Sequence, residues 1–195
     1  MVGVPLPAEA HLGERMSMKI VKYIPAIERL HLIDDLKEII QSEDMVLFGE
    51  YGVFNPLSLA SAIGELICQK KFIEITARNR NRELIRSSLH TGAAAGFDGV
   101  IIASGSFNRE AGMGKPVYDL DPTQMLKLAL TLRSDGKIDQ SFSIGIRAAI
   151  GDGAPAARAR FLLREGADFI AVTEDPVTDD LRDHAVLIEE VSIQA

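Results

Sequence analysis

The sequence predicts an α/β fold of about six βα units with parallel strands. The main observation is the stretch from Lys71 to Ser106, where two short apolar segments flank a segment of helical periodicity. Phe72 to Thr76 is too short for a helix and rich in Phe and Ile, so it predicts a buried strand. Gly99 to Ala103 predicts the next strand. A strand-helix-strand unit of this kind places both strands parallel in one sheet.

The second observation is that the same alternation continues on both sides of this unit. Strands are predicted over Met18 to Ile24, Met45 to Tyr51, Ser141 to Ala149 and Asp168 to Thr173. Helices are predicted over Ile27 to Gln41, Asn55 to Ile67, Asn79 to Gly96, Asp121 to Arg133, Ala154 to Glu165 and Thr178 to Glu190, because apolar residues recur there at helical spacing. Pro56 and Pro122 each follow an N-cap residue, and Gly96 and Gly166 are helix-ending glycines.

Composition restricts the classes of function. The chain has 195 residues, 47% of them hydrophobic and 25% charged, which indicates one globular domain over residues 18–195 behind an N-terminal arm of residues 1–17. A net charge of -7 argues against nucleic-acid and anionic-membrane partners. Cys68 is the single cysteine, so an internal disulfide is excluded and a reducing cytoplasm is expected. The four histidines lack metal-site spacing, so no metal is expected.

Three motifs follow one another in the central stretch. Glu74-Ile75-Thr76-Ala77 is followed by Arg78-Asn79-Arg80-Asn81 and, after a small-residue helix, by Ser104-Gly105-Ser106. This order resembles the methylenetetrahydrofolate reductase family, flavin-containing (β/α)8 barrels in which H-L-T-C is followed by R-D-R-N, an alanine-rich helix and a T-G-D or R-G-D turn. The resemblance extends over residues 19–177, including the segments GKPVYDLD and EGADFIAVT. It implies a TIM-type (β/α) barrel, shortened because the family's last two strands have no counterpart.

The resemblance also implies a site. It places Lys22 at the family's proton-donating Glu, Glu50 at the Thr of a V-T-Y-G motif whose tyrosine lies near the flavin, and Glu74 at the H-L-T-C histidine. These three are the candidate catalytic residues. The cofactor, FAD, is expected to contact Tyr51, Thr76, Arg78, Asn81, Gly105, Ser106 and Tyr118. A folate or pterin-like substrate is expected to contact Arg147, Thr173 and Glu174.

Strand alternation supports part of this site without the resemblance. If Ile73 and Ile75 face the helices, Glu74 and Thr76 point into the barrel, and the same reasoning turns Arg147 inward. Lys22 and Glu50 are expected to join Glu74 and Arg147 in one network near the carboxyl ends of the strands. Two interpretations stay open, a structural plug in the barrel and a polar ligand site in which a glutamate acts as acid or base.

Two classes of function are therefore predicted. The first is a methylenetetrahydrofolate reductase-like oxidoreductase of one-carbon metabolism that binds a flavin or a reduced pterin. The alternative is a non-catalytic barrel homologue that acts as a subunit or interaction scaffold. An open barrel of six strands leaves two sheet edges, which proteins normally cover, so a homo-oligomer or a partner subunit is expected as well.

Overall fold

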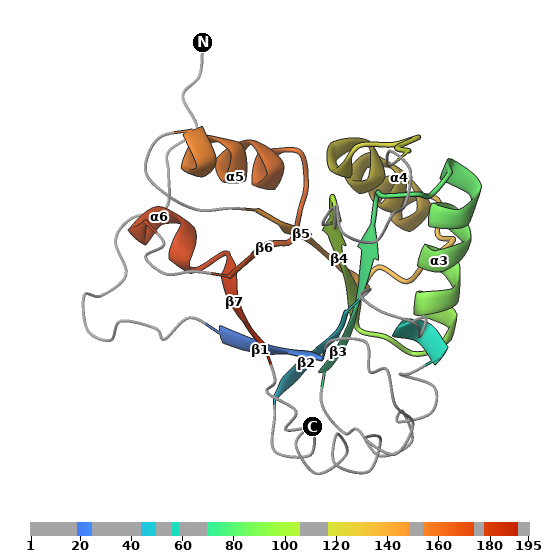
Figure 1. Cartoon of the computed structure of the whole chain (residues 1–195), viewed down its shortest axis with the longest axis horizontal. Coiled ribbons are helices and arrows are strands. Elements are labelled where there is room, and N and C mark those ends of the chain that lie inside the picture. Colours follow the sequence, from blue (N-terminus) through green and yellow to red (C-terminus); the bar gives the residue numbers. More distant parts are fainter. Residues whose placement is uncertain are drawn as a thin grey trace, which may run out of the picture.

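The computed structural model describes residues 19–24, 44–49, 56–58, 70–105, 117–148, 154–173 and 178–190. Seven parallel strands pair in chain order, and the last pairs with the first to close a barrel (Figure 1). The strands are β1 (Lys19–Ile24), β2 (Met45–Phe48), β3 (Lys70–Thr76), β4 (Gly99–Ala103), β5 (Ser143–Arg147), β6 (Phe169–Val172) and β7 (Ala185–Glu190). The helices are α3 (Arg82–Ala94), α4 (Pro122–Ser134), α5 (Ala154–Arg164) and α6 (Asp179–Arg182).

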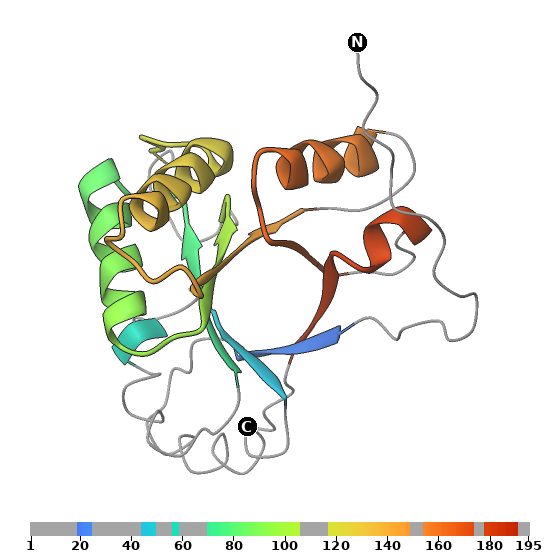
Figure 2. The ribbon, with the colours of Figure 1, turned by 180° about the vertical axis from the view of Figure 1, so that it is seen from behind.

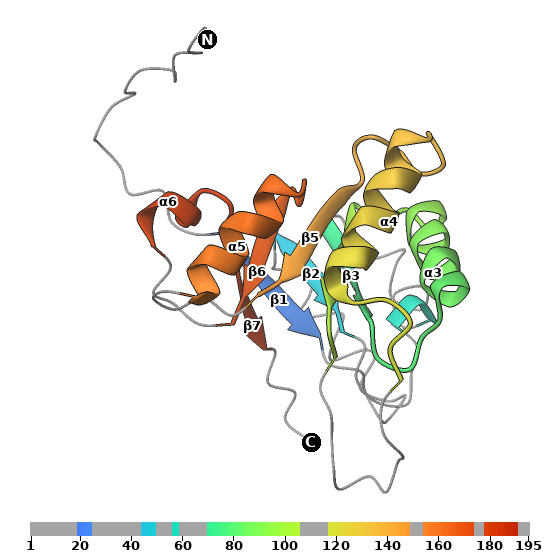
Figure 3. The same cartoon turned by 90° about the horizontal axis from the view of Figure 1, so that it is seen from above.

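The predicted fold class is confirmed: the chain is a TIM-type α/β barrel with parallel strands. The named helices lie outside the ring of strands, as the view from behind also shows (Figure 2). Helices α3 and α4 lie side by side against one half of the ring (Figure 3). Helix α4 begins as predicted, since Asp121 accepts a hydrogen bond from Gln124 N at 2.9 Å and Pro122 occupies the first turn.

One predicted element is wrong, and it changes how the barrel closes. The segment predicted as a helix from Thr178 to Glu190 is the single turn α6 followed by strand β7. The run Ala185 to Ile188 is continuously apolar, and its alternate residues Val186 and Ile188 face the barrel interior, which is a strand pattern. Because β7 pairs with both β6 and β1, the barrel has no open edge there. The argument for an oligomer from open edges therefore no longer applies.

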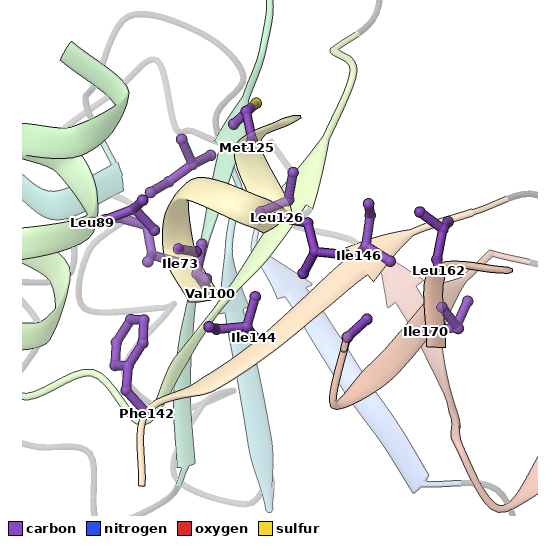
Figure 4. Packing of buried hydrophobic residues seen from close by; sticks show 14 of the residues in the cluster. Ile73, Leu89, Val100, Met125, Leu126, Phe142, Ile144, Ile146, Leu162 and Ile170 are labelled. Carbon is purple, nitrogen blue, oxygen red and sulfur yellow. The ribbon is translucent and has the colours of Figure 1, made fainter. Parts of the chain in front are cut away.

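The core has two separate parts. The larger part lies between the strands and the helices, and Figure 4 shows Ile73, Val100 and Ile144 meeting Leu89 of α3 and Leu126 of α4 there. The smaller part fills the barrel interior with side chains from six strands: Val21, Leu47, Phe72, Ile101, Ala171, Val186 and Ile188.

The interior part is densely packed around an aromatic pair. The rings of Phe72 and Phe169 meet edge to face, with centroids 5.5 Å apart. A Cβ added to Gly99 would lie 2.7 Å from the Phe72 ring, and one added to Gly145 would collide with the ring of Phe169. These two glycines therefore leave the space that the two rings occupy, and the barrel interior is a packed core.

Two similar turns connect neighbouring strands at their amino-terminal ends. Helix α3 is followed by Gly96 and Asp98, and helix α5 by Gly166 and Asp168, with both glycines at positive φ, 75° and 107°. The Asp98 carboxylate accepts a hydrogen bond of 2.7 Å from the backbone N–H of Lys71, the second residue of β3. The Asp168 carboxylate does the same for Ile144, the second residue of β5, also at 2.7 Å. Each aspartate thus ties the strand that it precedes to the neighbouring strand.

In the described part of the chain, none of the helices combines the length and the apolar character that crossing a membrane requires. The cytoplasmic location stays a prediction.

Candidate functional site at the carboxyl ends of the strands

A partly buried ion pair lies in the barrel interior near the carboxyl ends of the strands. Glu74 is on β3 and Arg147 ends β5, and Arg147 Nη1 donates a hydrogen bond of 2.8 Å to Glu74 Oε1. The Glu74 side chain is 4% exposed, whereas the Arg147 side chain is 34% exposed. Strand alternation predicted that the side chains of Glu74 and Arg147 point into the barrel, because their neighbours Ile73, Ile75 and Ile146 face the helices. The guanidinium therefore connects a buried carboxylate with the open end of the barrel.

Tyr23 completes this cluster from the neighbouring side of the barrel. Its hydroxyl donates to Glu74 Oε2 at 3.3 Å, and its ring lies 5.6 Å from the Arg147 guanidinium carbon, a cation–π distance. A Cβ added to Gly49 would collide with the Tyr23 ring, so the glycine after β2 makes room for the aromatic side chain. We call Tyr23, Glu74 and Arg147 the interior triad.

The environment changes the acidity of two members of the triad. Burial raises the pKa of Glu74 above its ordinary value, and this outweighs the nearby Arg147 charge and the hydrogen bonds, which lower it. Burial also raises the pKa of the Tyr23 hydroxyl, and the negative charge of Glu74 adds to this effect. Tyr23 is therefore a neutral hydrogen-bond donor at physiological pH, and Glu74 holds a proton more readily than an exposed glutamate does.

The raised pKa of Glu74 predicts how stability depends on pH. A carboxyl whose native pKa lies above its unfolded value of 4.5 contributes stability below that pH, and this contribution is lost as the pH rises through the native pKa. Compared with Glu74→Gln, which does not titrate, the wild type should lose melting temperature as the pH rises from 4 to 8. Thermal denaturation of both proteins across this range measures the difference. If the melting temperature of the wild type instead rises relative to that of Glu74→Gln as the pH increases, the ion pair with Arg147 affects the pKa of Glu74 more than burial does.

Lys22 lies on the other face of the sheet from the position that we expected. Val21 and Tyr23 belong to the barrel interior and Ile24 to the outer core, so Lys22 between them faces outward. Its ammonium donates to Glu189 Oε2 on β7 at 2.8 Å. The resemblance placed a functional side chain one position away from the inward-facing Tyr23, and a shift of one residue in a strand reverses the face.

Three of the predicted cofactor residues do lie together at the same end of the barrel. Thr76 ends β3, Arg78 follows it and Gly105 follows β4. A Cβ added to Gly105 would lie 3.0 Å from Arg78 Cβ and 3.2 Å from Thr76 Cβ. The glycine has a φ of 85°, which only glycine adopts readily. The turn after β4 therefore packs closely against the end of β3.

Two further predicted contacts have structural roles next to this turn. Asn81 is the N-cap of α3 and accepts a hydrogen bond from Leu84 N at 2.8 Å. Tyr118, 47% exposed, forms an isolated backbone bridge with Arg80. Arg80 in turn donates to Ser88 Oγ of α3 at 2.8 Å, and burial lowers the pKa of its guanidinium. The arginine-rich turn is thus attached partly to α3 and partly to the segment that begins at residue 117.

Thr173 lies just after β6 and is exposed at the same end of the barrel. Glu50, Tyr51, Ser106 and Glu174 lie outside the described residues, as does the N-terminal arm.

Sequence reasoning missed Tyr23 and Glu190. The signal for Tyr23 was the alternation of β1, in which Val21 and Tyr23 share a face. Glu190 ends β7, and because this segment was predicted as a helix, the sequence did not place Glu190 on a face of the sheet.

The described residues include no group of three or more His, Cys, Asp or Glu side chains arranged to hold a metal ion.

The fold and the triad define a (β/α) barrel with a polar site at the carboxyl ends of its strands, and solved structures of the same class exist. Phosphonopyruvate hydrolase is similar at a TM-score of 0.55 and 13% identity, covering 85% of this chain and 61% of that chain. The phosphoenolpyruvate phosphomutase of Streptomyces platensis subsp. rosaceus has a TM-score of 0.54 and 12% identity, with 79% and 59% covered. The structure of 2,3-dimethylmalate lyase, a member of the PEP mutase/isocitrate lyase superfamily, has a TM-score of 0.53 and 12% identity. The match covers 90% of this chain and 69% of that chain.

This chain spans about three fifths of the length of the first two of these structures. No family model and no curated protein matches its sequence.

These comparisons correct the predicted family and function. The similar structures carry the names of other enzymes, and one of them, 2,3-dimethylmalate lyase, is described as a PEP mutase/isocitrate lyase superfamily member. The predicted membership of the methylenetetrahydrofolate reductase family and the predicted folate oxidoreductase function are therefore wrong. The alternative of a non-catalytic reductase homologue has no support either. At 13% identity and below, the likeness establishes the barrel fold alone. FAD binding, the partners and the oligomeric state stay predictions.

Proposed function

We propose that the chain is an enzyme of the lyase or hydrolase class that binds a small carboxylic acid at the carboxyl ends of its strands. The observation that carries the proposal is the position of Arg147, which ends β5 and has a side chain 34% exposed above a buried carboxylate. Barrel enzymes place their sites at this end. A guanidinium binds carboxylates through two parallel N–H donors, and one of the Arg147 nitrogens is used by Glu74.

The similar structures support the choice of substrate class. Their names describe enzymes that act on phosphonopyruvate, 2,3-dimethylmalate and oxaloacetate, all small acids. A phosphonopyruvate hydrolase structure also contains oxalate and Mg²⁺. We take from these names the size and the charge of the ligand.

The other two members of the triad supply proton chemistry beside the bound acid. Cleaving a bond next to a carboxylate requires a group that exchanges a proton with the substrate. Glu74 has a raised pKa and receives a hydrogen bond from Tyr23, so it can hold that proton. A ligand carboxylate on Arg147 would share the positive charge that now favours ionised Glu74. Binding should therefore raise the pKa of Glu74 further and take up protons.

Titration calorimetry with oxalate tests the binding step. Wild type should bind oxalate, and Arg147→Lys, which keeps the charge but not the two parallel donors, should weaken binding about tenfold or more. The double variant Glu74→Gln with Arg147→Gln removes both charges together and should abolish binding. Binding by the wild type should also take up protons, seen as an enthalpy that depends on the ionisation enthalpy of the buffer.

The matched control is Arg160→Gln. Arg160 on α5 holds Asp180 through two hydrogen bonds of 2.7 and 3.0 Å on the outer surface, so its loss should leave oxalate affinity unchanged. Turnover is measured by NMR with phosphonopyruvate, oxaloacetate and 2,3-dimethylmalate. Equal oxalate affinity in wild type and Arg147→Lys would remove Arg147 from the site and sink the proposal.

A further inference from the structure

Glu190 is an inward-facing acid at the carboxyl end of the barrel that the proposed function does not use. Val186 and Ile188 of β7 point into the barrel interior, and the alternation of the strand gives Glu190 the same face. In the β1–β7 ladder Glu190 is the partner of Tyr23. Glu190 therefore stands beside the interior triad, on the next strand from Tyr23.

Glu190 and its neighbour Glu189 differ in their partners. Glu189 faces outward and forms an ion pair of 2.8 Å with Lys22. No basic side chain in the described part of the chain pairs with Glu190, which is exposed. An acid at the rim of a site weakens the binding of a ligand that carries only negative charge relative to one that also carries a positive group.

The charges near Tyr23 have opposite signs. The Arg147 guanidinium carbon lies 5.6 Å from the ring centroid, and Glu190 adjoins Tyr23 across the strand ladder. Both charges act on the Tyr23 hydroxyl: the guanidinium lowers its pKa and the Glu190 carboxylate raises it. The Tyr23 side chain is neutral, and it separates a cation from an anion at one opening.

We propose that the small acid bound at this end of the barrel is an amino acid, with its carboxylate on Arg147 and its ammonium on Glu190. The inference rests on the proposed function, because it takes the carboxylate site on Arg147 as given. It goes further in naming the second charged group of the substrate. Each charge of such a ligand meets an opposite charge, and each contact is a charge-assisted hydrogen bond.

Three ligands that share one carbon skeleton separate the two contacts. Pyruvate, L-lactate and L-alanine carry a carboxylate next to an oxo, a hydroxyl or an ammonium group. Calorimetric titration of the full chain should give L-alanine an affinity about tenfold or more above that of pyruvate. In Glu190→Gln this preference should disappear, through loss of alanine affinity with the pyruvate affinity unchanged or slightly raised.

Glu189→Gln is the control, because it removes a carboxylate from the adjacent position on the opposite face of the same strand. It should leave all three affinities unchanged. Pyruvate binding as tight as L-alanine, or an alanine preference that survives Glu190→Gln, would overturn the inference. If all three bind equally and Arg147→Lys weakens all three, the proposed function stands and the inference fails. No binding of any of the three would sink both.

Discussion

Replacing Phe72 by alanine should lower the free energy of unfolding by about 3–5 kcal/mol. Phe72 is 3% exposed in the barrel interior, where its ring meets the Phe169 ring edge to face and lies against Gly99. The surrounding strands close on themselves, so they cannot collapse into the space that the ring leaves. Urea denaturation followed by circular dichroism measures the loss.

Val117→Ala is the control for this prediction, because the Val117 side chain is mostly exposed, at 68%. Its effect should stay within about 0.5 kcal/mol. A loss below about 1 kcal/mol in Phe72→Ala would show that the barrel interior is not the packed core described above.

Arg147→Leu should cost about 2 kcal/mol at pH 8 and less at pH 4. The change removes the ion-pair partner of Glu74, whose side chain is 4% exposed. The ionised form of Glu74, which needs the cation, is more populated at pH 8 than at pH 4, so the cost of losing Arg147 should rise with pH. The cost lies below that of a fully buried pair because Arg147 is partly exposed to water. Urea denaturation of the wild type and Arg147→Leu at pH 4 and pH 8 measures the loss in the free energy of unfolding at each pH.

The double variant Glu74→Gln with Arg147→Leu separates the charge from the packing. With no carboxylate to leave unpaired, it should be more stable at pH 8 than Arg147→Leu alone. A cost in Arg147→Leu that is the same at both pH values would mean that packing of the arginine chain, and not its charge, stabilises the barrel.

The local patterns predicted much of the fold. Strand alternation placed Glu74 and Arg147 in the barrel interior, because Ile73, Ile75 and Ile146 had to face the helices. Glycine and proline marked the ends of the helices correctly, since backbone conformation at Gly96 and Pro122 depends on those residues themselves.

The failures lie where a long-range contact decides. The segment 185–190 has apolar residues that suit a helix face or a strand, and its pairing with β1, far away in the chain, selects the strand. Tyr23 acquires its role from Glu74 and Arg147, on two other strands. The family resemblance failed for a different reason. Short motifs such as Arg78 to Asn81 serve here to start a helix and to join two loops, which many barrels require.

The turns that contain Asp98 and Asp168 bear on which loops of this protein can be replaced. Asp98 and Asp168 tie β3 to β4 and β5 to β6 at the amino-terminal ends of the strands, opposite the interior triad. These bonds add to the strand ladders at the amino-terminal ends and involve none of the segments at the carboxyl ends of the strands. These two contacts should therefore persist when the segments at the carboxyl ends of the strands change in length or composition. The protein is accordingly a good recipient for grafted loops, in which a new specificity is installed at one end while the other holds the barrel together.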